Sequence, residues 1–261
     1  MEKLRLLLGG VGLVVALAVS VAPAAADPTA GPPICAGPAS GVTPISGKYR
    51  DLTITGERYV PSGSVLKVRR DLTIAPGSCL DAFTLGTVSV GGNVRVAPAA
   101  TFALGCTPGS LGPPLDQPPC DGQTTNDMVG GSIFAWKALT MYLDGDTIGG
   151  SVLSFGGGPG LAPNAPFVNF PVKDNTIDGN VVVWGWHGGW AGVIRNTVGG
   201  NVIFSQNVSV QDPDAMEVVT NTIARNLICF GNSPAVQVGD SGGSPNNVGG
   251  KKIGQCTAPG L

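Results

Sequence analysis

The fold is decided by a unit that recurs along the chain, seen clearly in DTIGGSVLS (146–154), NTIDGNVVV (175–183) and NTVGGNVIF (196–204). Related copies are VSVGGNVRV (88–96), DMVGGSIFA (127–135), NTIARNLIC (221–229) and NNVGGKKIG (246–254). Successive copies begin 39, 19, 29, 21, 25 and 25 residues apart, so the period is a little over twenty residues with one double-length step. This self-similarity is typical of a solenoid, in which each coil buries its apolar residues by stacking on its neighbours.

Within each copy, apolar side chains alternate as they do along a β-strand. Ile177 and Val181 share parity and are expected to face inward, and we interpret Gly179 between them as permitting the bend that joins two strands. Two columns of polar residues recur at the corners. They are Asn93, Ser132, Ser151, Asn180, Asn201 and Asn226, and Asp127, Asp146, Asn175, Asn196, Asn221 and Asn246. Stacked amides bond to each other and to backbone, so both columns are predicted to be structural ladders.

A column of threonines follows the second polar column, at Thr147, Thr176, Thr197 and Thr222. Its parity predicts that it faces outward. A second parallel threonine column, which ice-binding solenoids usually need, is missing from the sequence. We therefore interpret the column as a cross-strand ladder of residues that favour β-structure.

The repeat extends upstream, because DLTI occurs at both Asp51 and Asp71, twenty residues apart. We expect one solenoid domain over residues 49–261, with residues 27–48 as a Pro-rich lead-in or N-terminal cap. Roughly nine coils would fit in this stretch. At about 4.8 Å per stacked strand, the rod would be on the order of 45 Å long.

The composition agrees with short strands and turns. The chain of 261 residues contains 41 Gly and 22 Pro, and only 12% of its residues are charged. Long helices tolerate Gly and Pro poorly, which argues against a helical bundle or a coiled coil. The hydrophobic content of 43% separates the chain from the disordered class, so we predict an all-β protein.

The N-terminus has the features of a secretory signal peptide over residues 1–26. Lys3 and Arg5 precede an apolar run, and small residues end at Ala26. We therefore expect a secreted, extracellular protein with no membrane association after cleavage, since no second apolar stretch of spanning length follows. The net charge of -2 makes nucleic acid an unfavourable partner.

Six cysteines follow the predicted cleavage site: Cys35, Cys79, Cys106, Cys120, Cys229 and Cys256. An even number in an exported chain indicates three disulfides rather than metal ligands. Cys106 and Cys120 bracket a Pro-rich loop and are expected to form a local pair. Cys229 and Cys256 occupy nearly equivalent points of the last two coils and would close the C-terminal end. Elimination then pairs Cys35 with Cys79.

Short Val-rich strands, Gly bends and Asn columns from about Tyr49 to Cys256 resemble the right-handed parallel β-helix. The whole chain is similar to small exported solenoid proteins of actinobacterial type. The resemblance implies the architecture and the handedness only, because parallel β-helices include pectate lyases, polygalacturonases and adhesins. Of the four motifs of the polygalacturonases, none is intact here, so the likeness to pectate-degrading enzymes is one of architecture.

The segment VVVWGWHGGW (181–190) gathers Trp184, Trp186 and Trp190 around the single histidine, His187. Alternate residues of a strand share a face, so Trp184 and Trp186 are expected to stand side by side. Flat indoles form platforms on which sugar rings stack. We therefore name these four residues as a candidate ligand-binding site, with burial of the rings in the core as the alternative.

A second candidate is a set of carboxylates at Asp144, Asp146, Asp174 and Asp178. If adjacent coils bring them together, they can perform acid and base chemistry on a glycan or bind calcium. Turn chemistry is the alternative, since Asp is common at bends. No metal-ligand or cofactor motif accompanies them, so no cofactor is expected beyond that calcium alternative.

These observations favour a secreted, non-catalytic β-helix protein with a structural or surface-binding role, whose partner is a polysaccharide or cell-surface glycan. The alternative is a polysaccharide-degrading lyase or glycoside hydrolase that uses the four aspartates. A self-assembling extracellular scaffold is a further alternative, although the lead-in and the Cys-closed end resemble caps that prevent end-to-end stacking.

Overall fold

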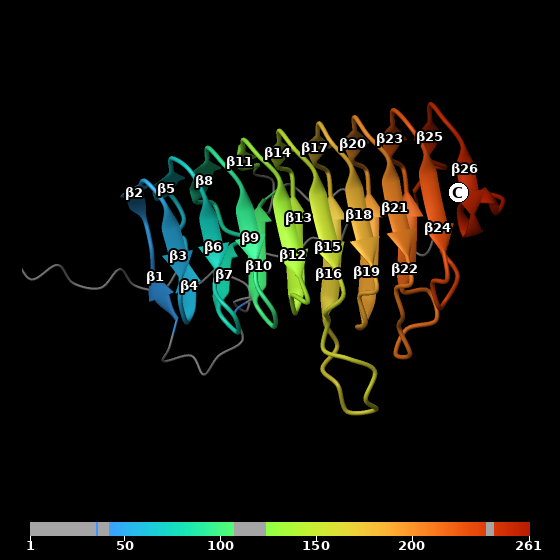
Figure 1. Cartoon of the computed structure of the whole chain (residues 1–261), viewed down its shortest axis with the longest axis horizontal. Coiled ribbons are helices and arrows are strands. Elements are labelled where there is room, and N and C mark those ends of the chain that lie inside the picture. Colours follow the sequence, from blue (N-terminus) through green and yellow to red (C-terminus); the bar gives the residue numbers. More distant parts are fainter. Residues whose placement is uncertain (1–34, 36–41, 107–123, 239–242) are drawn as a thin grey trace, which may run out of the picture.

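The computed structural model describes residues 35, 42–106, 124–238 and 243–261, which form a parallel β-solenoid (Figure 1). The chain makes eight three-stranded turns and a ninth turn of two strands, and the turns stack in sequence order along one axis. The prediction of an all-β solenoid of roughly nine coils is confirmed. Within the described ranges the only helix is the 3₁₀ turn η2 (Gln255–Thr257), and no helix there is long and apolar enough to cross a membrane.

The strands form three parallel sheets, one on each side of the coil. Sheet A contains β1 (Thr43–Pro44), β4 (Glu57–Tyr59), β7 (Cys79–Ala82), β10 (Thr101–Gly105), β13 (Thr140–Asp144), β16 (Asn169–Lys173), β19 (Trp190–Ile194) and β22 (Met216–Val219). Sheet B contains β2 (Gly47–Tyr49), β5 (Val65–Val68), β8 (Thr87–Val90), β11 (Met128–Val129), β14 (Thr147–Ile148), β17 (Thr176–Ile177), β20 (Thr197–Val198), β23 (Thr222–Ile223) and β25 (Asn247–Val248). Sheet C contains β3 (Leu52–Ile54), β6 (Leu72–Ile74), β9 (Val94–Val96), β12 (Ile133–Trp136), β15 (Val152–Phe155), β18 (Val181–Trp184), β21 (Val202–Ser205), β24 (Leu227–Phe230) and β26 (Lys252–Gly254).

Residues at equivalent positions of the sequence repeat are paired with each other on neighbouring strands. Ile177 of β17 pairs with Ile148 in the previous coil and with Val198 in the next, and all three are buried. The threonine column lies on the outer face of sheet B, where Thr176 is exposed and pairs with Thr147 and Thr197. The core is therefore a continuous apolar column inside the coils, as the alternation predicts.

The first two strands, β1 and β2, fall largely within residues 27–48, so part of the expected lead-in already belongs to the solenoid. The signal peptide over residues 1–26 lies outside the described residues and stays a prediction. Disulfides join Cys35 to Cys79 and Cys229 to Cys256, as expected from the sequence. The expected pair of Cys106 with Cys120 involves Cys120, which lies outside the described residues.

The glycines between sheets B and C serve a different purpose from the expected bend. Gly149 does not need a positive φ, but a Cβ placed on it would come within 2.6 Å of the carbonyl oxygen of Gly130 in the previous coil. Carbon and oxygen atoms in contact keep a larger separation, so a side chain here would force the two coils apart. The glycine therefore permits close stacking of the turns.

Both polar columns form hydrogen-bonded ladders, as predicted. In the outer ladder, at the turn between sheets B and C, Asn180 Oδ1 accepts from the backbone N–H of Asn201 at 2.8 Å and from its Nδ2 at 3.0 Å. In the inner ladder, at the corner between sheets A and B, buried Asn196 Oδ1 accepts from the backbone N–H and the Nδ2 of Asn175, both at 3.0 Å. These side chains satisfy backbone groups that the coil corners bury.

A third ladder, which the sequence analysis did not identify, lies at the corner between sheets C and A. Asn207 donates from its backbone N–H and its Nδ2 to Asn232 Oδ1, at 3.1 and 3.0 Å. Asn232 in turn donates to Gln255 Oε1, at 3.0 Å from its backbone N–H and 2.9 Å from Nδ2. Each of the three corners of the coil therefore has its own column of side-chain amides.

The inner ladder predicts a stability effect for Asn196→Ala. Asn196 Nδ2 lies 2.8 Å from Val172 O and 3.0 Å from Asn221 Oδ1. Truncation leaves several buried groups unpaired and should cost about 3 kcal/mol, which lowers the melting temperature by about 6 to 12 °C. Thermal unfolding followed by circular dichroism measures the shift, with the exposed Thr197→Ala as the matched control. A change within 2 °C of the control would contradict the structural role of the ladder.

Candidate functional site

The outer surface of sheet C from β12 to β26 carries two rows of apolar side chains. The first row is Phe134, Leu153, Val182, Ile203, Ile228 and Ile253, and the second row is Trp136, Phe155, Trp184 and Phe230, with the buried Ser205 at the paired position between Trp184 and Phe230. We call these residues the aromatic face. Each row is in register, because its members are paired neighbours on successive parallel strands about 4.8 Å apart.

Exposure is greatest at the aromatic members of the face. Trp136 is 49% exposed and Trp184 is 47% exposed, with Phe155 between them in the same row. The rings of Phe155 and Phe134 lie 6.0 Å apart, and Lys137 Nζ lies 5.8 Å from the centre of a Trp136 ring. These side chains point outward because the alternate positions of each strand fill the core.

The aromatic face has a defined start along the solenoid. In the first three coils the equivalent positions of sheet C hold Thr53, Thr73 and Arg95, which are polar or charged. From β12 onward none of the outward residues of sheet C carries a charge. A contiguous exposed apolar surface of this kind is typical of a binding site.

The structure separates the three tryptophans that were expected to form one platform. Trp184 ends β18 and belongs to the aromatic face, whereas Trp186 is fully buried. The alternation does not continue past Trp184 because Gly185 has φ +72°, which turns the chain. The expectation that Trp184 and Trp186 share a surface is therefore wrong.

Trp186 occupies a rung of the third ladder. Its backbone N–H donates to Asn207 Oδ1 at 3.0 Å, and its indole Nε1 donates to the carbonyl of Leu139 at 3.1 Å. Its ring packs against Phe170 at a centroid distance of 5.6 Å. The indole thus fills the corner of the core and satisfies a backbone carbonyl, so Trp186 is a structural residue.

Trp190 and His187 lie away from the aromatic face. Trp190 begins β19 on sheet A, is half-buried, and donates from Nε1 to Glu217 Oε1 at 3.0 Å. His187 is half-buried in the turn before β19, where its backbone N–H donates to Gly157 O at 3.1 Å. Of the four predicted ligand-binding residues, only Trp184 lies on the exposed apolar surface.

The four predicted catalytic aspartates do not line a common open groove. Asp144 and Asp146 are buried, and Asp146 occupies a rung of the inner ladder. Asp174 forms a two-point ion pair with Arg195, at 2.7 and 2.6 Å. Asp178 is exposed at the turn between sheets B and C, at the other end of β17. Two hollows of the described surface are lined by none of them.

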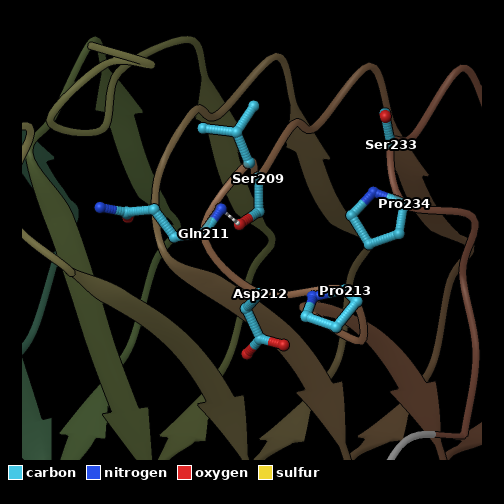
Figure 2. A pocket seen from close by; sticks show the side chains of 7 residues that line it. Ser209, Gln211, Asp212, Pro213, Ser233 and Pro234 are labelled. Carbon is cyan, nitrogen blue, oxygen red and sulfur yellow. Dashed lines mark hydrogen bonds between the residues drawn. The ribbon is translucent and has the colours of Figure 1, made fainter. Parts of the chain in front are cut away.

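These two hollows lie on other parts of the surface. The first, of about 330 Å³, is lined by Ser209, Val210, Gln211, Asp212, Pro213, Ser233 and Pro234 (Figure 2). The second, of about 480 Å³, lies over sheet A, where Glu57, Thr101, Tyr142 and Phe167 are among its lining residues. Burial raises the pKa of Tyr142 above its usual value.

Within the described ranges, no group of three or more His, Cys, Asp or Glu side chains is placed to hold a metal ion.

Sequence reasoning missed Trp136, Phe155 and Phe134, although the signal was present. The repeats that end in SIFAW (132–136), SVLSF (151–155) and NVVVW (180–184) place an apolar residue at every outward position. A strand with one solvated face normally alternates apolar and polar residues. Apolar residues at the outward as well as the inward positions of a strand therefore indicate that a ligand or partner covers its outer face.

Comparison with known proteins adds no family to this geometry. No protein-family model matches the chain, no curated protein matches it, and no solved structure matches it. The functional argument therefore depends on the arrangement of side chains described above.

The different positions of Trp186 and Trp184 predict stability effects of different size. Trp186→Ala removes a buried ring and a hydrogen bond, and should destabilise the fold by about 3 to 5 kcal/mol. Trp184→Ala removes a half-exposed ring and should change stability by less than about 1 kcal/mol. Urea unfolding monitored by circular dichroism tests both variants. Equal destabilisation by the two substitutions would show that the assignment of Trp184 to the surface is wrong.

Proposed function

We propose that the chain is an exported, non-catalytic binding protein that attaches to an uncharged polysaccharide surface through the aromatic face. The observation that carries the proposal is the in-register row of Trp136, Phe155 and Trp184 on three consecutive coils. The proposal keeps the role expected from the sequence but moves the contact from the tryptophan cluster around His187 to the outer side of sheet C.

The spacing of the row suits a linear sugar polymer. Trp136 and Trp184 are two coils apart, which is about 10 Å for strands separated by about 4.8 Å. This distance is close to the length of two linked sugar rings. The C–H face of a pyranose packs on an indole and excludes water from both, which is the usual basis of aromatic platforms for sugars.

The absence of outward charge on sheet C beyond Arg95, within the part of the chain that the structure describes, supports an uncharged partner. A charged polysaccharide such as polygalacturonate would lose solvation of its carboxylates on this apolar surface, where the nearby cation is the single ammonium of Lys137 beside Trp136. The flat geometry of a parallel sheet also suits the flat side of an ordered glycan better than a single flexible chain end.

The size of the face favours a glycan over a second copy of the chain. Six strands about 4.8 Å apart, each contributing about four residues of 3.3 Å, cover a footprint of about 380 Å². A stable protein dimer needs about 800 Å² from each partner. The footprint is therefore small for self-association but sufficient for several stacked sugar rings.

The environments of the aspartates support a non-catalytic role. Acid and base chemistry on a glycosidic bond uses two carboxyl groups that both reach the substrate. Asp144 and Asp146 are buried, and the carboxylate of Asp174 is held by Arg195. A polysaccharide-degrading function would therefore need groups other than this set.

The proposal predicts that Trp184→Ala and Trp136→Ala each weaken binding to an insoluble, uncharged β-glucan by about tenfold, equivalent to about 1.4 kcal/mol. The physical reason is the loss of one stacking ring from the row. A sedimentation assay with purified residues 27–261 and washed glucan particles measures the bound fraction against protein concentration. Thr176→Ala, on the outer face of sheet B in the same coil as Trp184, is the matched control and should bind as the parent chain does.

Three results would overturn the proposal. One is binding that is unchanged in both tryptophan variants, and another is preferential binding to polygalacturonate. The third is a change from dimer to monomer in Trp184→Ala during analytical ultracentrifugation, which would assign the aromatic face to self-association. Release of reducing or unsaturated ends in the same incubation would overturn the non-catalytic part.

A further inference from the structure

One rung of the inner ladder is chemically different from the rungs that follow it. In the later coils the rung is an asparagine whose Nδ2 donates to a backbone carbonyl of sheet A. These bonds run from Asn175 to Leu143, from Asn196 to Val172, from Asn221 to Val193 and from Asn246 to Val218, at 3.1, 2.8, 2.7 and 2.7 Å. Each asparagine thus supplies a proton to a buried acceptor, which is what an amide can do and a carboxylate cannot.

Asp146 holds the same rung one coil earlier, because Thr147 and Thr176, the next residues, are register partners. The carbonyl at the matching place is that of Leu104, since Leu104 pairs with Leu143. An ionised Asp146 would therefore aim a negative oxygen at a carbonyl oxygen. The backbone N–H of Asp146 still donates to Asn175 Oδ1 at 2.9 Å, so the ladder continues through this position.

The carboxyl of Asp146 is buried, and within the described ranges neither of its oxygens has a hydrogen bond of normal geometry. The groups around it are acidic. Asp127 precedes it in the column, and Asp144 lies two residues away at the end of β13. The basic residue on the adjoining strand is Lys173, the register partner of Asp144.

These surroundings disfavour the charged form of the Asp146 carboxyl. Burial raises its pKa well above the ordinary value, the charges of Asp127 and Asp144 raise it further, and the backbone of Asp144 opposes the shift weakly. Burial also raises the pKa of Asp127 to about 6, although Val88 N–H and the Thr125 hydroxyl donate to its carboxylate. Neighbouring carboxyls that share a buried site do not both ionise readily.

We propose that Asp146 is held as a neutral carboxylic acid that donates its O–H to the Leu104 carbonyl in place of an asparagine amide. The protonated acid has nearly the same shape as the amide and restores the missing donor. The junction between the fourth and fifth coils is then a proton-dependent joint, and the solenoid holds together best in acidic surroundings. This inference is independent of the aromatic face.

The direction of the pH dependence follows from the raised pKa of Asp146. In the unfolded chain the pKa of an aspartate is about 4, so between that value and the higher folded pKa the folded chain binds more protons. The free energy of unfolding therefore decreases as the pH rises from about 4 through the folded pKa. Asp127 contributes in the same direction between pH of about 4 and 6, because its folded pKa is about 6.

The test compares the melting temperature of the full chain from pH 4 to pH 8 with that of Asp146→Asn. We expect the parent chain to lose stability across this range and the variant to show a flatter profile. At pH 8 the variant should melt higher by about 3 °C or more. Asp178→Asn, which neutralises an exposed turn carboxylate, is the matched control and should follow the parent profile.

A second measurement detects the proton directly and does not depend on the folding of one variant. At pH 7 the infrared spectrum of the parent chain should contain the carbonyl band of a protonated carboxylic acid, and Asp146→Asn should lack it. Asp127→Asn should retain the band, because this substitution leaves the buried carboxyl of Asp146 and the Leu104 carbonyl in place.

The proposal is overturned if the acid band is missing from the parent chain, or if Asp146→Asn is less stable than the parent at every pH. It is also overturned if calcium at pH 8 raises the melting temperature of the parent but not of Asp146→Asn. That result would show that a cation, and not a proton, neutralises the carboxyl.

Discussion

The structure depends on one constraint, which is that the corners of a stacked coil bury polar backbone groups. At the corner between sheets A and B and at the corner between sheets C and A the ladder residues are buried, so water cannot satisfy the N–H and C=O groups there, whereas the column between sheets B and C is half-exposed. Columns of side-chain amides at the three corners supply the missing partners, as Asn196, Asn201 and Asn207 illustrate. The apolar column inside the coil provides the driving force, and the ladders determine which residues stack on which.

The same constraint explains the two unusual corner residues. Trp186 stands where later coils have an amide, and its indole N–H reaches the Leu139 carbonyl as the amides reach theirs. Asp146 stands on the inner ladder with no donor of its own when ionised, which is why its rung is expected to need a proton. Both residues attract attention as functional groups in the sequence, and both are accounted for by the needs of the corner.

The side chains inside the coil and at its corners stabilise the fold, so we expect the binding residues at the outward positions of the strands. The three sheets use these positions differently. Sheet B presents threonines such as Thr176 to water, and the outer side of sheet A is largely buried, as the five buried residues of β10 show. Sheet C carries the aromatic face, whose rings at Trp136, Trp184 and Phe230 are about half exposed. Exposed rings on an otherwise solvated surface are costly in solubility, which favours a binding role.

The sequence by itself determined the repeat, the parity of the strands, two of the three ladders and the last disulfide, because stacking forces equivalent residues into register. It did not determine where Trp184, Trp186 and Trp190 point. The positive φ at Gly185 ends the alternation after Trp184, so that Trp186 lies in the core, and Trp190 begins the next strand, on sheet A. The aromatic face and the environment of Asp146 were likewise decided by the tertiary structure. They join residues from separate coils, and only the stacked fold shows which side chains water reaches.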